Sequence, residues 1–247
     1  MPPTDASAEA GTDPSAGAGT DGEDTLDLRL PEDFATLVAP DGPGPDRSRP
    51  WLGDDLLDRV ADWGPSVTSA GVLHLVPVRL ERDLPLVARW MNDPAVAAFW
   101  QLTGPPEVTE DHLRAQLSGD GRSVPCVGVL EGTPMSYWEI YRADLDPLAR
   151  HCPVRPHDTG IHLLIGDAAD RGRGLGPILI RAVADLVLSR RPRCGRVLAE
   201  PDVRNIPSVA AFLAAGFRRA AEIDLPAKRA ALMVRDRSPH GARQSGS

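Results

Sequence analysis

The spacing of apolar and polar residues predicts strands that alternate with helices from residue 71 to residue 237. Short apolar runs, which are typical of strands, occupy residues 72–78, 124–130, 136–143 and 159–166. From residue 175 to 187 the apolar side chains instead recur every three or four positions, as on one face of a helix. The remaining predicted elements are a strand at 195–201, a helix at 205–216 and strands at 217–225 and 229–235. This alternation, with paired strands at its end, predicts an α/β (α+β) protein built on a mixed sheet.

Residues suited to helix ends mark where several of these helices begin and stop. Asp83 is the expected N-cap of a first helix, with Pro85 in its first turn. Thr109 is expected to open a second, short helix. A later helix is expected to follow Asn205, a favourable N-cap, and to end at Gly216, because glycine tolerates a left-handed backbone.

The acidic charge of the chain is concentrated in its first fifty residues. Residues 1–50 hold eleven acidic and three basic side chains, a net charge of −8, which is also the net charge of all 247 residues. Because small polar and acidic residues cannot bury a core, we predict a disordered acidic leader there. The predicted divisions are the leader at 1–50, an appended segment at 51–70, one folded domain at 71–237 and a loose tail at 238–247. The rest of the chain has balanced charge, which argues against a nucleic-acid-binding protein. Whether the leader binds a partner is left open.

Composition also disfavours several other classes of protein. Cys126, Cys152 and Cys194 have neither the spacing of a zinc site nor that of a disulfide framework, so no metal is expected. No run approaches ~20 apolar residues, and the first residues lack the features of a secretory signal. We therefore expect a cytoplasmic protein that does not contact a membrane.

A glycine-rich segment at residues 170–177, DRGRGLGP, lies between a predicted strand and a predicted helix. Glycines at a helix start leave backbone N–H groups uncovered, and that end of a helix attracts anions. The segment lacks the Lys-Ser/Thr ending of a P-loop. It predicts a pyrophosphate-binding loop made of Arg171, Gly172, Arg173, Gly174, Leu175 and Gly176.

At these motifs the sequence resembles the GNAT superfamily of acyl-CoA N-acyltransferases. RGRGLG at 171–176 resembles its pantetheine–pyrophosphate loop, and AEPDVRNIPSVAAFLAAGF at 199–217 resembles the strand, asparagine and helix that follow. MNDPAVAAFW, YWEIYRADLDPL, HDTGIHLLIG and EPDVRN resemble the branch of hydroxamate-siderophore acyltransferases, which acylate lysine or hydroxylysine in aerobactin-type and mycobactin-type assembly. The resemblance spans residues 72–236.

The resemblance implies a GNAT fold, with a mixed sheet of six or seven strands flanked by four helices. It also implies acetyl-CoA or another acyl-CoA as co-substrate and a contact between Asn205 and its pantetheine arm. The implied reaction is direct acyl transfer to a small-molecule amine or hydroxylamine. The implied acceptor is hydroxylysine or a similar diamine on the way to a hydroxamate siderophore.

His162 and Asp202 are the catalytic residues that the resemblance implies. His162 lies in an otherwise apolar strand, where a lone histidine more often belongs to the core. In the related branch the matching histidine is a proposed general base, a role that suits the ordinary pKa of imidazole. The matching aspartate acts with it, although Asp202 would also suit a helix cap. Many GNAT enzymes protonate the leaving thiolate with a tyrosine where this chain has Phe212, so Ser208 and Asp202 become candidates for that step.

Aromatic residues make up only 4% of the chain, yet five of the eleven lie in two short segments, which also hold candidate acceptor contacts. Core packing is the default role of large aromatic side chains. Alternation along a strand places Tyr137 and Trp138 on opposite faces, and one face could line a slot for an aliphatic amine, with Glu139 or Asp144 at its cationic end. The candidate acceptor-binding residues are Trp100, Trp138, Glu139 and Tyr141.

Two other functions stay open on sequence alone. An aminoglycoside-type N-acetyltransferase would favour an acidic cleft, to which residues 144–146 and Asp158 could contribute, but the balanced charge gives it no support. A non-catalytic acyl-CoA-binding module would keep the glycine loop and would not need His162 together with Asp202. The presence of both residues favours an enzyme.

Overall fold

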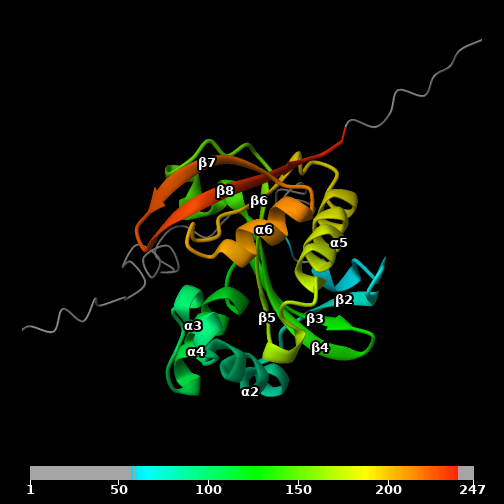
Figure 1. Ribbon diagram of the computed structural model, residues 1–247, viewed down its shortest axis with the longest axis vertical. Helices are drawn as coiled ribbons and strands as arrows, with labels where there is room; N and C mark the ends of the chain where they lie inside the picture. The colour runs from blue at the N-terminus through cyan, green and yellow to red at the C-terminus, as the bar shows by residue number, and fades with distance from the viewer. Residues whose placement is uncertain (1–56, 58, 239–247) are drawn as a thin grey trace, which may run out of the picture.

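The structure of the protein, a computed structural model, describes residue 57 and residues 59–238 (Figure 1). Its strands are β1 (Ser66–Thr68), β2 (Gly71–Pro77), β3 (Ser123–Leu130), β4 (Thr133–Arg142), β5 (Thr159–Ile165), β6 (Arg196–Ala199), β7 (Arg218–Leu225) and β8 (Lys228–Asp236). Its α-helices are α2 (Leu80–Met91), α3 (Pro94–Trp100), α4 (Pro106–Leu117), α5 (Leu175–Arg190) and α6 (Ile206–Ala214). Short 3-10 turns are η1 (Val60–Asp62), η2 (Ala143–Leu145), η3 (Pro147–Arg150) and η4 (Ala168–Asp170). The predicted leader at 1–50 and the tail from residue 239 lie outside the described residues.

The eight strands form one mixed sheet in the order β1-β2-β3-β4-β5-β6-β8-β7. Neighbouring strands are antiparallel except for β5 and β6, which are parallel. That parallel pair is short, because only Thr159 pairs with Val197 and Gly160 with Leu198. The two strands therefore part after two positions, and this opening in the sheet positions the site described below.

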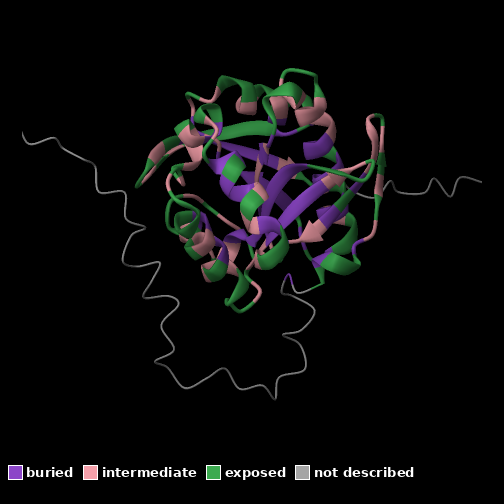
Figure 2. Cartoon of the chain, turned by 90° about the horizontal axis from the view of Figure 1, so that it is seen from below, coloured by how far each residue is buried: buried purple, intermediate pink, exposed green. Residues whose placement is uncertain are grey.

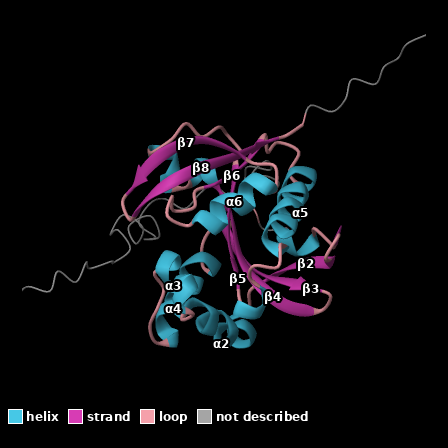
Figure 3. Ribbon diagram, viewed as in Figure 1, coloured by secondary structure: helices cyan, strands magenta, loops and turns pink. Residues whose placement is uncertain are grey.

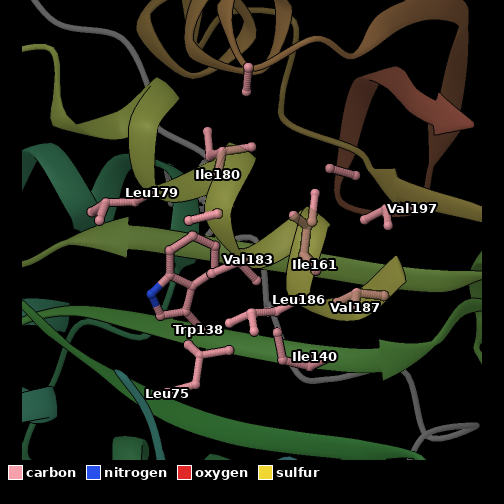
Figure 4. Packing of buried hydrophobic residues seen from close by; sticks show 14 of the residues in the cluster. Leu75, Trp138, Ile140, Ile161, Leu179, Ile180, Val183, Leu186, Val187 and Val197 are labelled. Carbon is pink, nitrogen blue, oxygen red and sulfur yellow. The ribbon is translucent and has the colours of Figure 1, made fainter. Parts of the chain in front are cut away.

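Helices cover both faces of this sheet. Figure 2 shows that the buried residues gather in the strands at the centre of the molecule. In Figure 3, α2, α3 and α4 lie together on one side of β5, and α5 lies on the other side. Trp90 of α2 and Leu113 of α4 share a buried cluster with Tyr137 of the sheet. On the opposite face, Val183 of α5 packs beside Trp138 of β4 (Figure 4). Burial of these apolar faces is the main force that holds the layers together.

No helix in the described part of the chain combines the length and apolar character needed to cross a bilayer.

Two elements were not predicted from the sequence, β1 and α3. β1 is only three residues long and α3 is apolar on all sides, so neither has a spacing pattern that reveals it. β1 lies in the segment 51–70, which was expected to be an appendage, and it pairs with β2 of the domain. Leu57, Val60 and Trp63 from that segment are buried in the main core cluster. The described part of the segment thus contributes an edge strand and three core side chains.

The prediction that Asp83 caps the first helix was wrong, because α2 begins three residues earlier, at Leu80. The buried carboxylate of Asp83 lies inside the first turn instead. It accepts a hydrogen bond from the backbone N–H of Arg79 at 2.8 Å and another from the Arg82 guanidinium at 2.6 Å. The carboxylate therefore satisfies a helix-terminal N–H from within the helix rather than from in front of it.

The start of α4 was also placed too late, since the helix begins at Pro106 and Thr109 is buried within it. The predicted ends of the last helix are confirmed. Asn205 caps α6 by accepting a hydrogen bond at Oδ1 from the backbone N–H of Ser208 at 3.2 Å. Gly216 follows the helix with a φ of +92°, the conformation that favours glycine.

Candidate active site

A cavity of about 680 Å³ lies between the α3–α4 segment and α6, beside the opening between β5 and β6. Its polar lining is Gln101, Asp111, His112, Glu139, His162, Glu200, Asp202, Asn205, Ser208 and Lys228. Its apolar lining includes Phe99, Trp100, Leu102, Val108, Ile161, Leu163 and Phe212. A concave, largely apolar site with a few convergent polar groups is typical of small-molecule binding.

His162 is held between two carboxylates at the wall of this cavity. The register of β4 and β5 places Glu139 directly opposite His162, and His162 Nδ1 lies 2.9 Å from Glu139 Oε2. The other ring nitrogen, Nε2, contacts Glu200 Oε1 just beyond the end of β6. An ionised carboxylate only accepts hydrogen bonds, so each ring nitrogen must donate. His162 is therefore an imidazolium cation, with a third of its side chain left exposed.

The charges around His162 stabilise this cation. Burial alone would lower the pKa of His162, but Glu200 and Glu139 outweigh burial and raise that pKa to about 10. Burial would raise the pKa of Glu200, but His162 outweighs it and lowers that pKa to about 2. The pKa of Glu139 is likewise held well below its usual range, against the effect of burial, by His112 and His162. Near neutral pH the site thus holds one cation between two anions.

Glu139 is fixed by three further donors on its other oxygen. Oε1 accepts hydrogen bonds from His112 Nε2 at 2.6 Å, Gln116 Nε2 at 2.7 Å and the Tyr137 hydroxyl at 2.9 Å. His112 and Gln116 stand one turn apart on α4, so they fasten that helix to β4 at the site. Neither residue was predicted from the sequence, because nothing in a polar helix indicates which of its side chains meets a distant strand.

Glu200 is a third residue of the site that was not predicted from the sequence. Its Oε2 accepts a hydrogen bond from the Tyr141 hydroxyl at 2.7 Å, and Lys228 Nζ lies 4.0 Å from Oε1. The residue is only 5% exposed, so its charge must be balanced by these neighbours. A signal was present in the sequence, since Glu200 directly precedes Pro201 in the EPDVRN motif at the end of a predicted strand.

Asp202 lines the same cavity but is paired with Arg204 rather than with His162. Its carboxylate accepts hydrogen bonds from the Arg204 backbone N–H at 2.8 Å and from Arg204 Nη2 at 2.6 Å. The bond to the Arg204 side chain lowers the pKa of Asp202. The structure therefore brings His162 and Asp202 to one cavity without joining them.

One face of α6 contributes to the cavity wall. Asn205, Ser208 and Phe212 recur at intervals of three and four residues, so they point the same way. Asn205 caps α6, as expected, and it also lines the cavity. The Phe212 ring packs edge-to-face on Phe217 with ring centres 5.1 Å apart.

The predicted aromatic contacts divide between the two faces of β4. Trp100 lines the cavity, with its ring centre 6.1 Å from that of His162. Tyr141 packs against His162 at 4.8 Å and supports the ring. Trp138 lies on the other face, fully buried under α5, because adjacent residues of a strand alternate in direction. The structure thus does not bring Trp138 to the cavity.

The glycine loop keeps the start of α5 uncovered. Gly172 and Gly174 have φ values of +72° and +77°, and a Cβ added to either would meet no atom within 4 Å. Gly174 is also the N-cap residue of α5, so the first N–H groups of that helix stay open to an anion. Gly176 and Leu175 serve packing instead: a Cβ on Gly176 would lie 3.4 Å from Ala211 of α6, and Leu175 packs against the main core.

The two arginines of this loop have different surroundings. Arg171 Nη1 donates to Asp93 Oδ1 at 2.7 Å, and its Nε donates to the Ile165 carbonyl at 3.0 Å. Arg171 therefore ties the loop to the start of α3. Arg173 has a side chain that is 64% exposed, with a surface contact of 3.1 Å to Asp170. Arg173 is thus the arginine whose guanidinium is available at the loop surface.

Residues 79–225 match the model of the acetyltransferase (GNAT) domain. The chain belongs to the GNAT family. This GNAT chain is 38% identical over 187 residues to the lysine N-acyltransferase MbtK of Mycolicibacterium paratuberculosis, covering 74% of this chain and 82% of that protein. It is 36% identical over 155 residues to the N(6)-hydroxylysine O-acetyltransferase of Escherichia coli, covering 63% of this chain and 49% of that protein.

Solved structures of other proteins share the fold. An uncharacterized protein from Bacillus halodurans has a TM-score of 0.66 at 32% identity, covering 70% of this chain and 89% of that chain. The aminoglycoside acetyltransferase AAC(6')-Ib in complex with coenzyme A has a TM-score of 0.58 at 25% identity, covering 67% and 95%. The predicted GNAT fold and the resemblance to the siderophore branch are confirmed, with one strand and one helix more than expected among the described residues.

Proposed function

We propose that the protein transfers an acyl group from acyl-CoA to a side-chain nitrogen of lysine, hydroxylysine or a similar diamine in hydroxamate siderophore biosynthesis. The acceptor nitrogen is an amine or a hydroxylamine. The observation that carries this proposal is His162, held between Glu139 and Glu200 in the wall of a cavity of small-molecule size. The names of two relatives, a lysine N-acyltransferase and an N(6)-hydroxylysine O-acetyltransferase, support the acceptor.

The residues around the cavity fit acyl-CoA. Gly172 and Gly174 hold a left-handed backbone with open space above it, which suits the pyrophosphate at the start of α5. Arg173 would add a cation there, and Asn205 lines the cavity where the pantetheine arm would enter. When bound, acyl-CoA supplies a thioester whose carbonyl carbon is the electrophile.

His162 supplies the proton chemistry in this proposal. The reaction forms a C–N bond, breaks a C–S bond and moves a proton from the nitrogen to the sulfur. As a cation, His162 gives one N–H proton to the sulfur, which breaks the hydrogen bond of that nitrogen to its carboxylate. The freed ring nitrogen then takes a proton from the acceptor nitrogen, while the other carboxylate holds the ring. The resemblance implies a general base at His162, whereas in this proposal the ring starts as an acid. The acid also provides the proton that Phe212, lacking a hydroxyl, does not.

The aminoglycoside alternative has weaker support. An aminoglycoside carries several ammonium groups and needs carboxylates that are available to bind them. Here three of the four carboxylates that line the cavity already have a cationic partner: Glu139 and Glu200 pair with His162, and Asp202 pairs with Arg204. Identity to AAC(6')-Ib is also lower than identity to the lysine N-acyltransferase.

Thiol release from acetyl-CoA, followed by mass spectrometry of the product, tests the proposed function. The acceptors are N6-hydroxylysine, lysine, cadaverine and kanamycin, with His162→Gln as the inactive control. We expect N-acylation of hydroxylysine or lysine by the wild-type protein and a fall of ~10²–10⁴-fold in the variant. Turnover with kanamycin alone, or with no acceptor in the set, contradicts the proposal.

A further inference from the structure

Asp111 of α4 is a carboxylate of the cavity wall whose charge is not balanced within the described part of the protein. The other three carboxylates of the wall, Glu139, Glu200 and Asp202, each have the cationic partner given above. The Asp111 side chain is exposed, and it forms neither a hydrogen bond nor an ion pair with any residue that the structure describes. A carboxylate in this situation can bind a cation that enters the cavity from solvent.

The basic side chains nearest to Asp111 in the cavity wall are engaged elsewhere. Lys228 Nζ lies 4.0 Å from Glu200 Oε1, and His112 Nε2 lies 2.6 Å from Glu139 Oε1. Neither of these two side chains pairs with Asp111, although all of them line the same cavity. The cation that Asp111 is suited to bind must therefore come with a ligand.

The position of Asp111 on α4 brings it close to the His162 ring. Val108, Asp111 and His112 all line the cavity, and their spacing of three and four residues places them side by side on one face of the helix. Two hydrogen bonds link this face to the ring, since His112 contacts Glu139 and Glu139 contacts His162. A short molecule in the cavity can thus reach the ring with one end and α4 with the other.

The cavity wall beside these polar groups is apolar. Phe99 and Trp100 of α3 and Val108 of α4 contribute to it, and the Trp100 ring centre lies 6.1 Å from that of His162. Apolar walls of this kind suit a chain of methylene groups. Aromatic rings also attract a nearby ammonium group.

The two carboxylates that the sequence suggested for the cationic end of an acceptor are already occupied. Glu139 accepts hydrogen bonds on both of its oxygens. Asp144 accepts a hydrogen bond from Arg142 at 2.8 Å, and it does not line the cavity. Among the described carboxylates of the cavity wall, Asp111 is the one that remains for this role.

The acceptors of the proposed function share a chemical feature that fits Asp111. Lysine, hydroxylysine and a diamine each carry a second nitrogen, separated from the reacting nitrogen by a chain of methylene groups. This second nitrogen is an amine with an ordinary pKa above neutrality, so it is mostly an ammonium at pH 7. It takes no part in acyl transfer.

We propose that Asp111 binds the second, unreacting ammonium of the acceptor and thereby positions the other nitrogen at His162. The inference rests on the proposed function and assigns the residue that selects an acceptor with two nitrogens. The Asp111 carboxylate accepts charge-assisted hydrogen bonds from the ammonium, while the apolar wall contacts the methylene chain. No bond is made or broken at Asp111, so the residue contributes to acceptor binding and not to the chemical step.

Two acceptors that differ only in this ammonium test the assignment with the full-length protein. N6-hydroxylysine carries it, and 6-(hydroxyamino)hexanoic acid is the same molecule with a hydrogen atom in its place. Lysine and 6-aminohexanoic acid form the corresponding pair for an amine acceptor. In the pair that the wild-type protein acylates, we expect a KM about tenfold lower for the acceptor that carries the ammonium.

Asp111→Asn removes the charge and keeps the size of the side chain. It should raise KM for the acceptor with the ammonium by about tenfold and leave kcat nearly unchanged, because the lost contact is the same in the bound and transition states. KM for the acceptor without the ammonium should not rise. Asp111→Glu, which keeps the charge, should restore part of the lost affinity.

Glu107→Gln is the matched control. Glu107 is an exposed carboxylate one turn earlier on α4 that has no partner among the described residues and does not line the cavity. Its substitution removes the same charge from the same helix and should leave both KM values unchanged. Melting curves and CoA titrations by calorimetry verify that each variant is folded and binds CoA as the wild type does.

The outcomes separate this inference from the proposed function. In Asp111→Asn, an equal change of KM for both acceptors, or no change for either, overturns the inference. A selective rise of the same size in Glu107→Gln also overturns it, because the effect would then come from charge at a distance. In these cases wild-type turnover still supports the proposed function. Failure of the wild type to acylate hydroxylysine and lysine overturns the proposed function, and the inference with it.

Discussion

His162 and Glu200 hydrogen-bond across the gap at which β5 and β6 stop pairing. The last backbone pair joins Gly160 to Leu198, and two residues further along each strand the side chains take over the contact. The same ion pair therefore links β5 to the end of β6 beside the cavity and stabilises the positive charge of the His162 ring. A change at Glu200 should affect both the chemistry and the stability of the protein.

The partner of His162 in the proposed reaction is tested by comparing two carboxylates. Glu200→Gln should lower kcat on hydroxylysine by ~10²–10⁴-fold, because the amide no longer keeps His162 cationic. Asp202→Asn should cost less than about tenfold, since Asp202 contacts Arg204 and not the ring. Calorimetry should find CoA affinity unchanged in both variants. A larger loss in Asp202→Asn would instead make Asp202 the partner, as the resemblance implied.

The pH dependence of stability follows from the same pair. The pKa of His162 is raised from 6.5 to about 10. The contribution of its charge to the free energy of unfolding is therefore complete below pH 6.5 and is lost as pH rises through 10. The pKa of Glu200 is lowered from 4.5 to about 2, so its contribution is complete above pH 4.5 and is lost as pH falls through 2. Their joint contribution is therefore greatest between pH 4.5 and 6.5.

Urea unfolding of the wild type and His162→Gln from pH 5 to 10 checks this dependence. The difference in free energy of unfolding between the two proteins should be largest near pH 5 and should shrink towards pH 10. Arg114→Gln, which alters a surface ion pair, should show no such trend. A difference that stays constant with pH would mean that His162 contributes through packing alone.

The elements of the fold were predictable where the spacing of apolar residues persists over many positions. The amphipathic pattern from Leu175 to Val187 lies within α5 as observed. β1 and α3 escaped prediction because three residues, or a short helix that is apolar on all sides, carry no such pattern. The prediction that Asp83 caps the first helix was wrong, because an aspartate can accept a hydrogen bond from a helix-terminal N–H either from in front of the helix or from within its first turn.

The site was predictable only in part, because its contacts depend on strand register and helix packing. His162 and the glycine loop are local motifs and were found. The partner Glu139 is 23 positions from His162 and is joined to it only through the pairing of β4 with β5. His112 depends on how α4 packs, which no local pattern reveals. The alternation of side chains along a strand correctly predicted that Tyr137 and Trp138 lie on opposite faces of β4. The same rule, applied to every candidate on this strand, would have excluded Trp138 from the acceptor contacts.

The role of the glycine loop is tested with a matched pair of glycines. Gly174 and Gly132 both have a φ of +77°, and a Cβ on either would meet no atom within 4 Å. Gly132 lies in the turn between β3 and β4, away from the loop. Gly174→Ala and Gly132→Ala should therefore lose similar stability, about 1–2 kcal/mol each. Only Gly174→Ala should weaken CoA binding, by about tenfold in calorimetry, because the methyl group obstructs the start of α5. Equal CoA affinity in both variants would refute a phosphate site at this loop.

The last prediction separates the two arginines of the loop, which the sequence treats alike. Arg171 donates to Asp93 and to the Ile165 carbonyl, so Arg171→Ala removes internal bonds and should lower the Tm by several degrees. Asp93→Asn should shift the Tm in the same direction by less. Arg173 is mostly exposed, so Arg173→Ala should leave the Tm unchanged.

CoA titrations at low and high salt complete the comparison. Arg173→Ala should lower CoA affinity at low salt and reduce its salt dependence, because an exposed cation near a phosphate is screened by ions. Arg171→Ala should weaken CoA binding only through the changed conformation of the loop, so the salt dependence of CoA binding should be the same as in the wild type. An Arg171→Ala protein with the wild-type Tm and lost salt dependence would show that the guanidinium leaves Asp93 to bind the pyrophosphate directly.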